Sequence, residues 1–129
     1  MLLYHGTSMA FLPSIMKHGL KPRLGEVCLT DDFKLATVFA FQTCLSMRIV
    51  AQGDVSKMAD HYPIVIPVNV TKRGVEKVWE GFGYYYASSK LINPARLNFE
   101  GIRRWDYDDD VAQGVVGYLI ARNRPKINK

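Results

Sequence analysis

The sequence contains little cysteine and little histidine, and neither follows the pattern of a metal site. Only two cysteines, Cys28 and Cys44, and three histidines occur among 129 residues. His5, His18 and His61 lack ligand spacing with the cysteines or with one another, so we expect no bound metal. Both cysteines lie in apolar stretches. This favours buried free thiols in a reducing compartment, with a disulfide as the alternative.

Long apolar runs and a secretion signal are also missing from the sequence. No run approaches the roughly 20 apolar residues that span a bilayer. The N-terminus does not begin with a basic segment followed by an apolar one, as a signal peptide does. We therefore expect a cytoplasmic protein without membrane contact.

The chain does have the composition of an ordinary globular domain. Hydrophobic residues make up 48% and charged residues 22% of the sequence, which predicts one domain over residues 1–129 with a buried core. The net charge of +5 suits an anionic ligand, a nucleic acid or an acidic protein without choosing among them. Part of this charge lies in residues 122–129, for which a solvated terminal tail is the simpler explanation.

Polar caps and glycines predict three helices. They are expected after Ser8 up to Gly19, from about residue 32 to residue 51 behind a cap at Thr30 or Asp31, and from the acidic run 108–110 to residue 121. A strand over residues 115–120 is the alternative to the last helix, because Gly114 and Gly117 weaken it.

Runs rich in β-branched and aromatic residues predict the strands. They are expected at residues 2–7, 27–29, 63–70, 75–79 and 84–89, with residues 96–105 as a further candidate. Pro67 cannot donate to a ladder, which argues for an edge strand or a bulge. Two early helices and several later strands together predict an α+β domain.

The opening of the chain is its most informative segment. Leu2 and Leu3 run through Tyr4 into His5-Gly6-Thr7, which predicts a buried strand that stops at a polar tip. Gly6 has no Cβ, so another molecule can approach the backbone there. Strand, polar tip and capped helix together are typical of a ligand site at the edge of a sheet.

This opening resembles the start of the ADP-ribosyltransferase fold. It is most similar to the bacterial, poly-ADP-ribose-polymerase-like and RNA 2′-phosphotransferase-like branches, whose His-Gly-Thr or His-Gly-Ser tip holds NAD. Two further blocks, residues 25–32 with the helix around 35–40 and residues 84–97, follow in the family's order. The resemblance implies an α+β domain with split mixed or antiparallel sheets and NAD as co-substrate.

The resemblance also implies roles for the residues of the tip. His5 would hydrogen-bond the nicotinamide ribose, and the backbone of Gly6 would pair with the carboxamide. The alternative for His5 is a partly buried histidine satisfied by backbone groups. Thr7 and Ser8 are candidate ribose or phosphate contacts, although helix capping explains Ser8 equally well.

Two more candidate NAD contacts lie outside the tip. Phe39 stands near the family's aromatic residue that stacks on nicotinamide, with ordinary core packing as an even alternative. Cys28 occupies the place of a second aromatic residue of the family. Arg23 can reach a pyrophosphate, and a surface arginine is an equal alternative.

The catalytic glutamate of the family has no direct counterpart here. The family's place at the start of the late strand corresponds to Gly83 or Tyr84. Glu80 lies nearest and is the candidate catalytic acid beside His5, whereas Glu76 and Glu100 are more distant. Such a carboxylate would stabilise the positive charge that develops on the ribose as nicotinamide leaves.

These features predict an NAD-dependent mono-ADP-ribosyltransferase that modifies a macromolecule, either a protein or a nucleic acid, and releases nicotinamide. An RNA 2′-phosphotransferase-like enzyme and a non-catalytic domain that binds NAD, ADP-ribose or a partner are the alternatives. By fold-level analogy alone, a small domain of this kind fits a toxin or phage effector.

Overall fold

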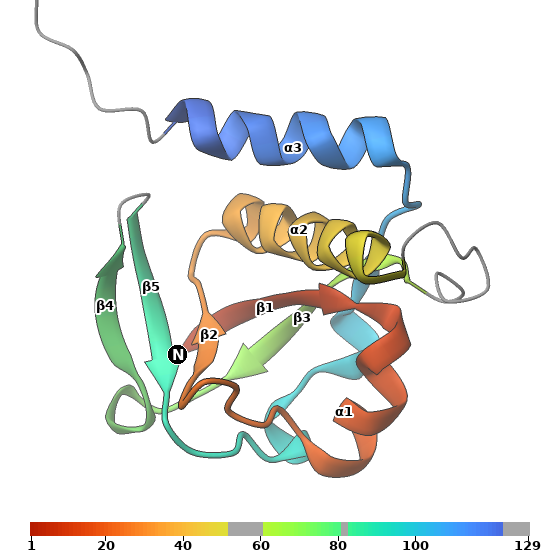
Figure 1. The fold of residues 1–129 in the computed structure, drawn as a ribbon. Coiled ribbons are helices and arrows are strands. Elements are labelled where there is room, and N and C mark those ends of the chain that lie inside the picture. Colours follow the sequence, from red (N-terminus) through yellow and green to blue (C-terminus); the bar gives the residue numbers. More distant parts are fainter. Residues whose placement is uncertain (52–60, 81–82, 123–129) are drawn as a thin grey trace, which may run out of the picture.

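The chain forms two small antiparallel sheets with helices packed against the first of them (Figure 1). The computed structural model describes residues 1–51, 61–80 and 83–122. In these ranges one sheet has the strand order β1 (Leu2–Ser8), β3 (Pro63–Asn69), β6 (Arg103–Arg104). The other has the order β2 (Val27–Leu29), β5 (Gly83–Ser88), β4 (Glu76–Glu80). The predicted α+β class is therefore confirmed, and both sheets are antiparallel.

Three α-helices accompany the sheets in the described part of the chain: α1 (Leu12–His18), α2 (Phe33–Ala51) and α3 (Asp109–Arg122). Ser8 caps the short 3-10 turn Met9–Phe11 that leads into α1, and Gly19, at φ 81°, ends α1. Figure 1 shows α2 lying between α3 and β1, with α1 on the other side of the first sheet.

The caps of the two longer helices are aspartates. Asp32 Oδ1 accepts hydrogen bonds from the backbone N–H groups of Lys34 and Leu35, at 3.0 and 3.3 Å, so the predicted cap at Thr30 or Asp31 is wrong by one or two positions. Thr30 Oγ1 instead accepts the N–H of Asp32. At α3, Asp108 caps the helix as predicted, and the alternative strand over 115–120 does not form.

Within the described ranges, one pair of backbone hydrogen bonds joins the two sheets. Tyr4 N–H donates to Thr30 O at 2.7 Å, and Thr30 N–H donates to Tyr4 O at 3.0 Å. Beyond this bridge β2 turns toward β5 and leaves β1, so no described strand pairs with this edge of β1 from His5 onward. The site described below lies along that edge.

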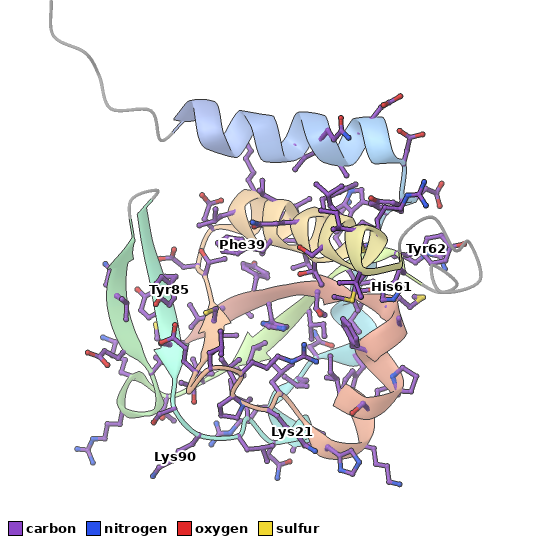
Figure 2. The ribbon with its side chains drawn as sticks, viewed as in Figure 1. Lys21, Phe39, His61, Tyr62, Tyr85 and Lys90 are labelled. Carbon is purple, nitrogen blue, oxygen red and sulfur yellow. The ribbon has the colours of Figure 1, made fainter. Side chains whose placement is uncertain are left out.

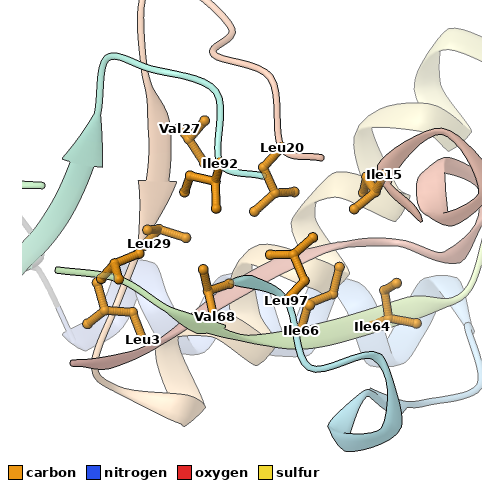
Figure 3. Packing of buried hydrophobic residues seen from close by; sticks show 11 residues of the cluster. Leu3, Ile15, Leu20, Val27, Leu29, Ile64, Ile66, Val68, Ile92 and Leu97 are labelled. Carbon is orange, nitrogen blue, oxygen red and sulfur yellow. The ribbon is translucent and has the colours of Figure 1, made fainter. Parts of the chain in front are cut away.

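The larger hydrophobic core fills the space between the first sheet and α1, β2 and the segment 92–97 (Figure 3). Alternate residues of β3 enter it, namely Ile64, Ile66 and Val68, whereas Val65 faces Ala36 and Ala40 of α2. Because β3 is covered on both faces, its sequence is apolar almost throughout.

Pro67 lies in the middle strand of its sheet, so the predicted edge position is wrong. Its carbonyl accepts a hydrogen bond from Asn98 N–H at 2.9 Å, on the side away from β1. The strand β6 pairs only with Ile64 and Val65. The missing N–H of Pro67 therefore costs no ladder hydrogen bond.

The candidate strand over residues 96–105 is also wrong for most of its length. The 3-10 turns Pro94–Arg96 and Phe99–Gly101 precede the two residues of β6. The side chains of Asn93 and Asn98 cap these turns by accepting backbone N–H groups, each at 3.0 Å. Asparagine thus offers the backbone a local partner in place of a ladder.

Gly53 is expected to end the second helix, residues 53–62 to form a loop, and residues 80–83 to form a turn. Gly53, most of this loop, residues 81–82 and the expected tail from residue 123 onward lie outside the described part of the chain. The side chain of Glu80 belongs with them, although its backbone closes β4 opposite Gly83.

By length and composition, α2 is able to cross a membrane over Phe33–Val50, contrary to the expectation from apolar runs. In the fold this helix packs against β1, β3 and α3, with Ala36, Ala40 and Cys44 fully buried. Core helices share this length and composition, so the property by itself assigns no membrane contact.

Gly6 is where β1 and α2 approach most closely. A Cβ built on Gly6 would overlap the carbonyl oxygen of Ala36 and lie 2.8 Å from Ala40 N. The glycine is therefore required by packing within the chain itself, whatever ligand binds nearby.

We predict that Gly6→Ala lowers the free energy of unfolding by about 3 kcal/mol or more, because the backbone of α2 must move to admit the methyl group. Gly114→Ala is the matched control, since nothing lies within 4 Å of a Cβ there. In helix α3 the control should be neutral or stabilising by up to about 1 kcal/mol. Denaturant unfolding of both variants measures the difference, and equal stabilities would contradict the packing argument.

Candidate functional site

Two adjoining cavities follow the free edge of β1 where the sheets diverge. The α1-side cavity has a volume of about 300 Å³ and is lined in part by Thr7, Phe11, Lys21 and Arg23. The α2-side cavity has about 380 Å³ and is lined in part by Phe39, Gln42, Ser46 and Tyr85. Both are lined by His5, Gly6, Glu26, Cys28 and Thr43, so they form one continuous groove.

His5 stands at the junction of the two cavities. Its Nδ1 lies 2.9 Å from the backbone oxygen of Cys28. A carbonyl only accepts, so the proton is on Nδ1 and the neutral ring leaves Nε2 as an acceptor. Burial lowers the pKa of His5; the hydrogen bond to Cys28 partly offsets this, and the charge of Arg23 lowers the pKa further. The neutral ring therefore offers Nε2 to a hydroxyl donor in the groove.

The backbone of Gly6 presents a donor and an acceptor at the same edge. Tyr4 turns its N–H and C=O toward β2, and alternate residues of a strand turn these groups the same way. Both groups of Gly6 therefore point away from β3, and no described residue bonds them. An N–H and a C=O side by side match the oxygen and the NH₂ of a primary carboxamide.

Phe39 and Tyr85 contribute aromatic rings to the α2-side cavity, from α2 and β5 respectively (both labelled in Figure 2). Phe39 is half-buried and also packs against the apolar cluster of Leu35 and Val38. The cavity and the core thus share this ring, and its contact with nicotinamide stays a prediction. Tyr85 is buried, and its hydroxyl donates to Glu26 Oε1 at 2.8 Å.

A tight turn places Arg23 and Glu26 at the α1-side cavity. The two residues exchange backbone hydrogen bonds of 3.0 and 3.1 Å, and Leu24 and Gly25 between them have φ of 51° and 89°. Two positive φ values are typical of a type I′ turn. The fully exposed Leu24 occupies a conformation that disfavours leucine by about 1–2 kcal/mol. The side chains of Arg23 and Glu26 lie on one face of this turn and line the same cavity.

The structure brings most of the sequence-predicted contacts together. His5, Gly6, Thr7, Arg23 and Phe39 all line the groove. Ser8 does not: it is fully buried, with Oγ 2.8 Å from His61 Nδ1 and accepting the N–H of Ala10. Ser8 therefore has the capping role that was its alternative.

Of the acids considered from the sequence, Glu80 is untested and the two others lie away from the groove. Glu80 ends β4, and its side chain lies outside the described residues. Glu76 and Glu100 are exposed, and neither lines the groove. Glu26, which the sequence analysis did not consider, lines both cavities. The sequence did contain a signal for this position. Glu26 lies two residues before Cys28, and residues i and i+2 of a strand share one face, so both side chains could be expected at the same site.

Both cysteines are free thiols, but only Cys44 is buried as expected. Burial raises the pKa of the Cys44 thiol to about 11, so this thiol stays protonated. Cys28 is exposed, because its neighbours Val27 and Leu29 point into the core and the alternation of β2 turns Cys28 to the opposite face. Among the described residues no group of three or more His, Cys, Asp or Glu can hold a metal ion.

No protein-family model matches this chain, and no curated protein sequence matches it. The resemblance to ADP-ribosyltransferases therefore stays a prediction, carried by the three sequence blocks.

The lowered pKa of His5 predicts that stability falls in mild acid. The unfolded chain has the higher His5 pKa, about 6.5, so it takes up a proton first as the pH falls. The neutral His5 ring therefore contributes to the free energy of unfolding above pH 6.5. This contribution is lost as the pH falls from 6.5 to the pKa of His5 in the folded protein. We expect a smaller loss of unfolding free energy between pH 7.5 and 5.5 in His5→Gln than in the wild type. His18→Gln, at an exposed position on α1, should behave like the wild type, and identical losses in all three proteins would contradict the prediction.

Proposed function

We propose that the groove binds NAD and that the protein transfers ADP-ribose from NAD to a macromolecular acceptor, releasing nicotinamide. The observation that carries the proposal is the edge of β1. There, the acceptor Nε2 of His5 lies next to the N–H and C=O of Gly6, which no described residue bonds, and these groups face a groove that separates two sheets. This set of groups fits a ribose hydroxyl and a carboxamide. The ADP-ribosyltransferase resemblance of the sequence points to the same ligand.

The nicotinamide end of NAD is assigned to the α2-side cavity. Its carboxamide would pair with Gly6, and Phe39 offers an aromatic face to the pyridinium ring. The nicotinamide ribose would then lie beside His5, whose Nε2 accepts a hydrogen bond from a ribose hydroxyl.

The adenosine diphosphate end is assigned to the α1-side cavity. Lys21 and Arg23 line this cavity and supply positive charge for the pyrophosphate. The Arg23 guanidinium already lies 5.3 Å from the centre of the Phe11 ring, so the ring helps to hold the charge at the cavity. Each cavity reaches the lower end of the roughly 300–1,000 Å³ typical of ligand pockets, and a dinucleotide can place one half in each.

In the proposed reaction the bond between ribose C1′ and the nicotinamide nitrogen breaks. Its electron pair moves to the ring nitrogen, so nicotinamide leaves as a neutral molecule and C1′ becomes cationic. A nucleophile of the acceptor then forms the new bond to C1′ and loses its proton to solvent. The chain's contribution is to orient nicotinamide at Gly6 and ribose at His5.

We predict that His5→Ala weakens NAD binding about fivefold or more, because it removes a hydrogen bond worth roughly 1–3 kcal/mol. Calorimetric titration with NAD measures the affinity, and thermal unfolding confirms that the variant is folded. His18→Ala serves as the control. Unchanged affinity in His5→Ala would exclude NAD from this edge. Nicotinamide release from NAD is measured separately, with and without cell lysate. If the protein binds NAD but releases no nicotinamide in either condition, it is a binding domain and not a transferase.

A second substitution tests the aromatic contact. We expect Phe39→Leu to lower NAD affinity while retaining the fold, since leucine roughly preserves the packing volume but offers no aromatic face. Affinity and unfolding temperature are measured on the same preparation. A drop in unfolding temperature with unchanged affinity would assign Phe39 to the core cluster of Leu35 and Val38 alone.

A further inference from the structure

We propose that Glu26 supplies the carboxylate that stabilises the cationic ribose and that Tyr85 is its positioning residue. This inference rests on the proposed function and replaces the acid expected at Glu80. Among the described residues, Glu26 is the one carboxylate that lines both cavities.

Glu26 faces the groove and not the core. Val27 and Leu29 of β2 enter the core, so Glu26 and Cys28 share the opposite face of the segment. The Cys28 Sγ lies 3.6 Å from Glu26 Oε1, which shows that the two side chains are neighbours on that face. The backbone oxygen of the same Cys28 holds His5 Nδ1. Residue 28 thus connects the carboxylate to the histidine proposed to bind the ribose.

Glu26 is held in place by its backbone and by its side chain. The turn at residues 23–26 fixes its backbone through two hydrogen bonds, and the Tyr85 hydroxyl donates to Oε1. Tyr85 is buried and its strand β5 pairs with β2, so this donor has a defined position. Within the described residues Oε2 has no hydrogen-bond partner, which leaves one carboxylate oxygen for a ligand.

The Glu26 carboxylate would act on the charge of the ribose. A fixed carboxylate beside C1′ lowers the energy of the positive charge that forms when nicotinamide leaves, and it can also accept a hydrogen bond from the ribose 2′-hydroxyl. No proton needs to move to Glu26 in this step. The carboxylate is most useful in the transition state, so its loss should reduce the rate more than the affinity.

Glu26→Gln tests the charge alone, because the glutamine oxygen can still accept the Tyr85 hydrogen bond. The rate of nicotinamide release from NAD, as kcat and KM, and the calorimetric affinity for NAD are measured for each protein. We expect affinity within about threefold of the wild type and kcat lower by about 10²-fold or more. Tyr85→Phe should lower kcat less, and Glu26→Asp should recover part of the loss.

Glu100→Gln is the matched control, since it changes the net charge equally at an exposed site outside the groove. It should retain the wild-type rate. Glu80→Gln tests the alternative, that Glu80 is the catalytic acid. Thermal unfolding verifies that every variant is folded. Two results would overturn the Glu26 assignment while the proposed function stands. One is a wild-type protein that releases nicotinamide together with equal kcat in Glu26→Gln and Glu100→Gln. The other is a lowered kcat in Glu80→Gln alone.

A wild-type protein that does not bind NAD would overturn the proposed function and the Glu26 assignment together. Binding without release would overturn every catalytic role in the groove, including that of Glu26. If Glu26→Gln fails to fold, Glu26→Asp and Tyr85→Phe decide: wild-type kcat in both would overturn the assignment, and a lower kcat at unchanged affinity would support it.

Discussion

The pair of backbone hydrogen bonds between Tyr4 and Thr30 is the contact on which the site depends. It joins the two sheets at one position and lets them separate immediately afterward. If β2 continued along β1, its backbone would occupy the N–H and C=O of Gly6, and the groove would close. Because β2 pairs with β5 instead, the edge of β1 stays available where His5 and Gly6 stand. The close packing of Gly6 on α2 fixes that edge from the other side.

His5 and Glu26 are held in the groove in the same way. Each uses one hydrogen-bonding atom to fix its position, and no described residue bonds its other hydrogen-bonding atom. His5 fixes Nδ1 on the Cys28 carbonyl, and Glu26 fixes Oε1 on the Tyr85 hydroxyl. Groups held in this way need little reorganisation when a ligand arrives, which favours specific binding and electrostatic stabilisation. The partners that do the holding, residue 28 and Tyr85, lie on neighbouring strands of the second sheet.

Local signals predicted the elements that depend on local interactions. The strand over 2–7, the helix ended by Gly19 and the helix capped by Asp108 form as expected, because a cap or an alternating pattern is complete within a few residues. Pro67 and the segment 96–105 were predicted incorrectly. In both cases Asn98 is involved: its N–H bonds Pro67, and its side chain caps a turn where a strand was expected. The bond to Pro67 joins distant parts of the sequence and is not visible from residue preferences, whereas the cap is a local asparagine preference that the predicted strand ignored.

The sequence by itself determined the α+β class, the polar end of the first strand, and a basic residue and an aromatic residue as candidates for a ligand site. The tertiary structure decided which of these residues meet. Cys28 is exposed, although burial was expected, because Val27 and Leu29 take the core face of β2. A three-residue strand has too few positions for this alternation to be assigned from the sequence. Glu26 joins the groove, and Ser8 is withdrawn from it, through contacts across 59 and 53 residues of sequence. Such contacts depend on strand register and on how the sheets diverge, and these are set only when the whole chain packs.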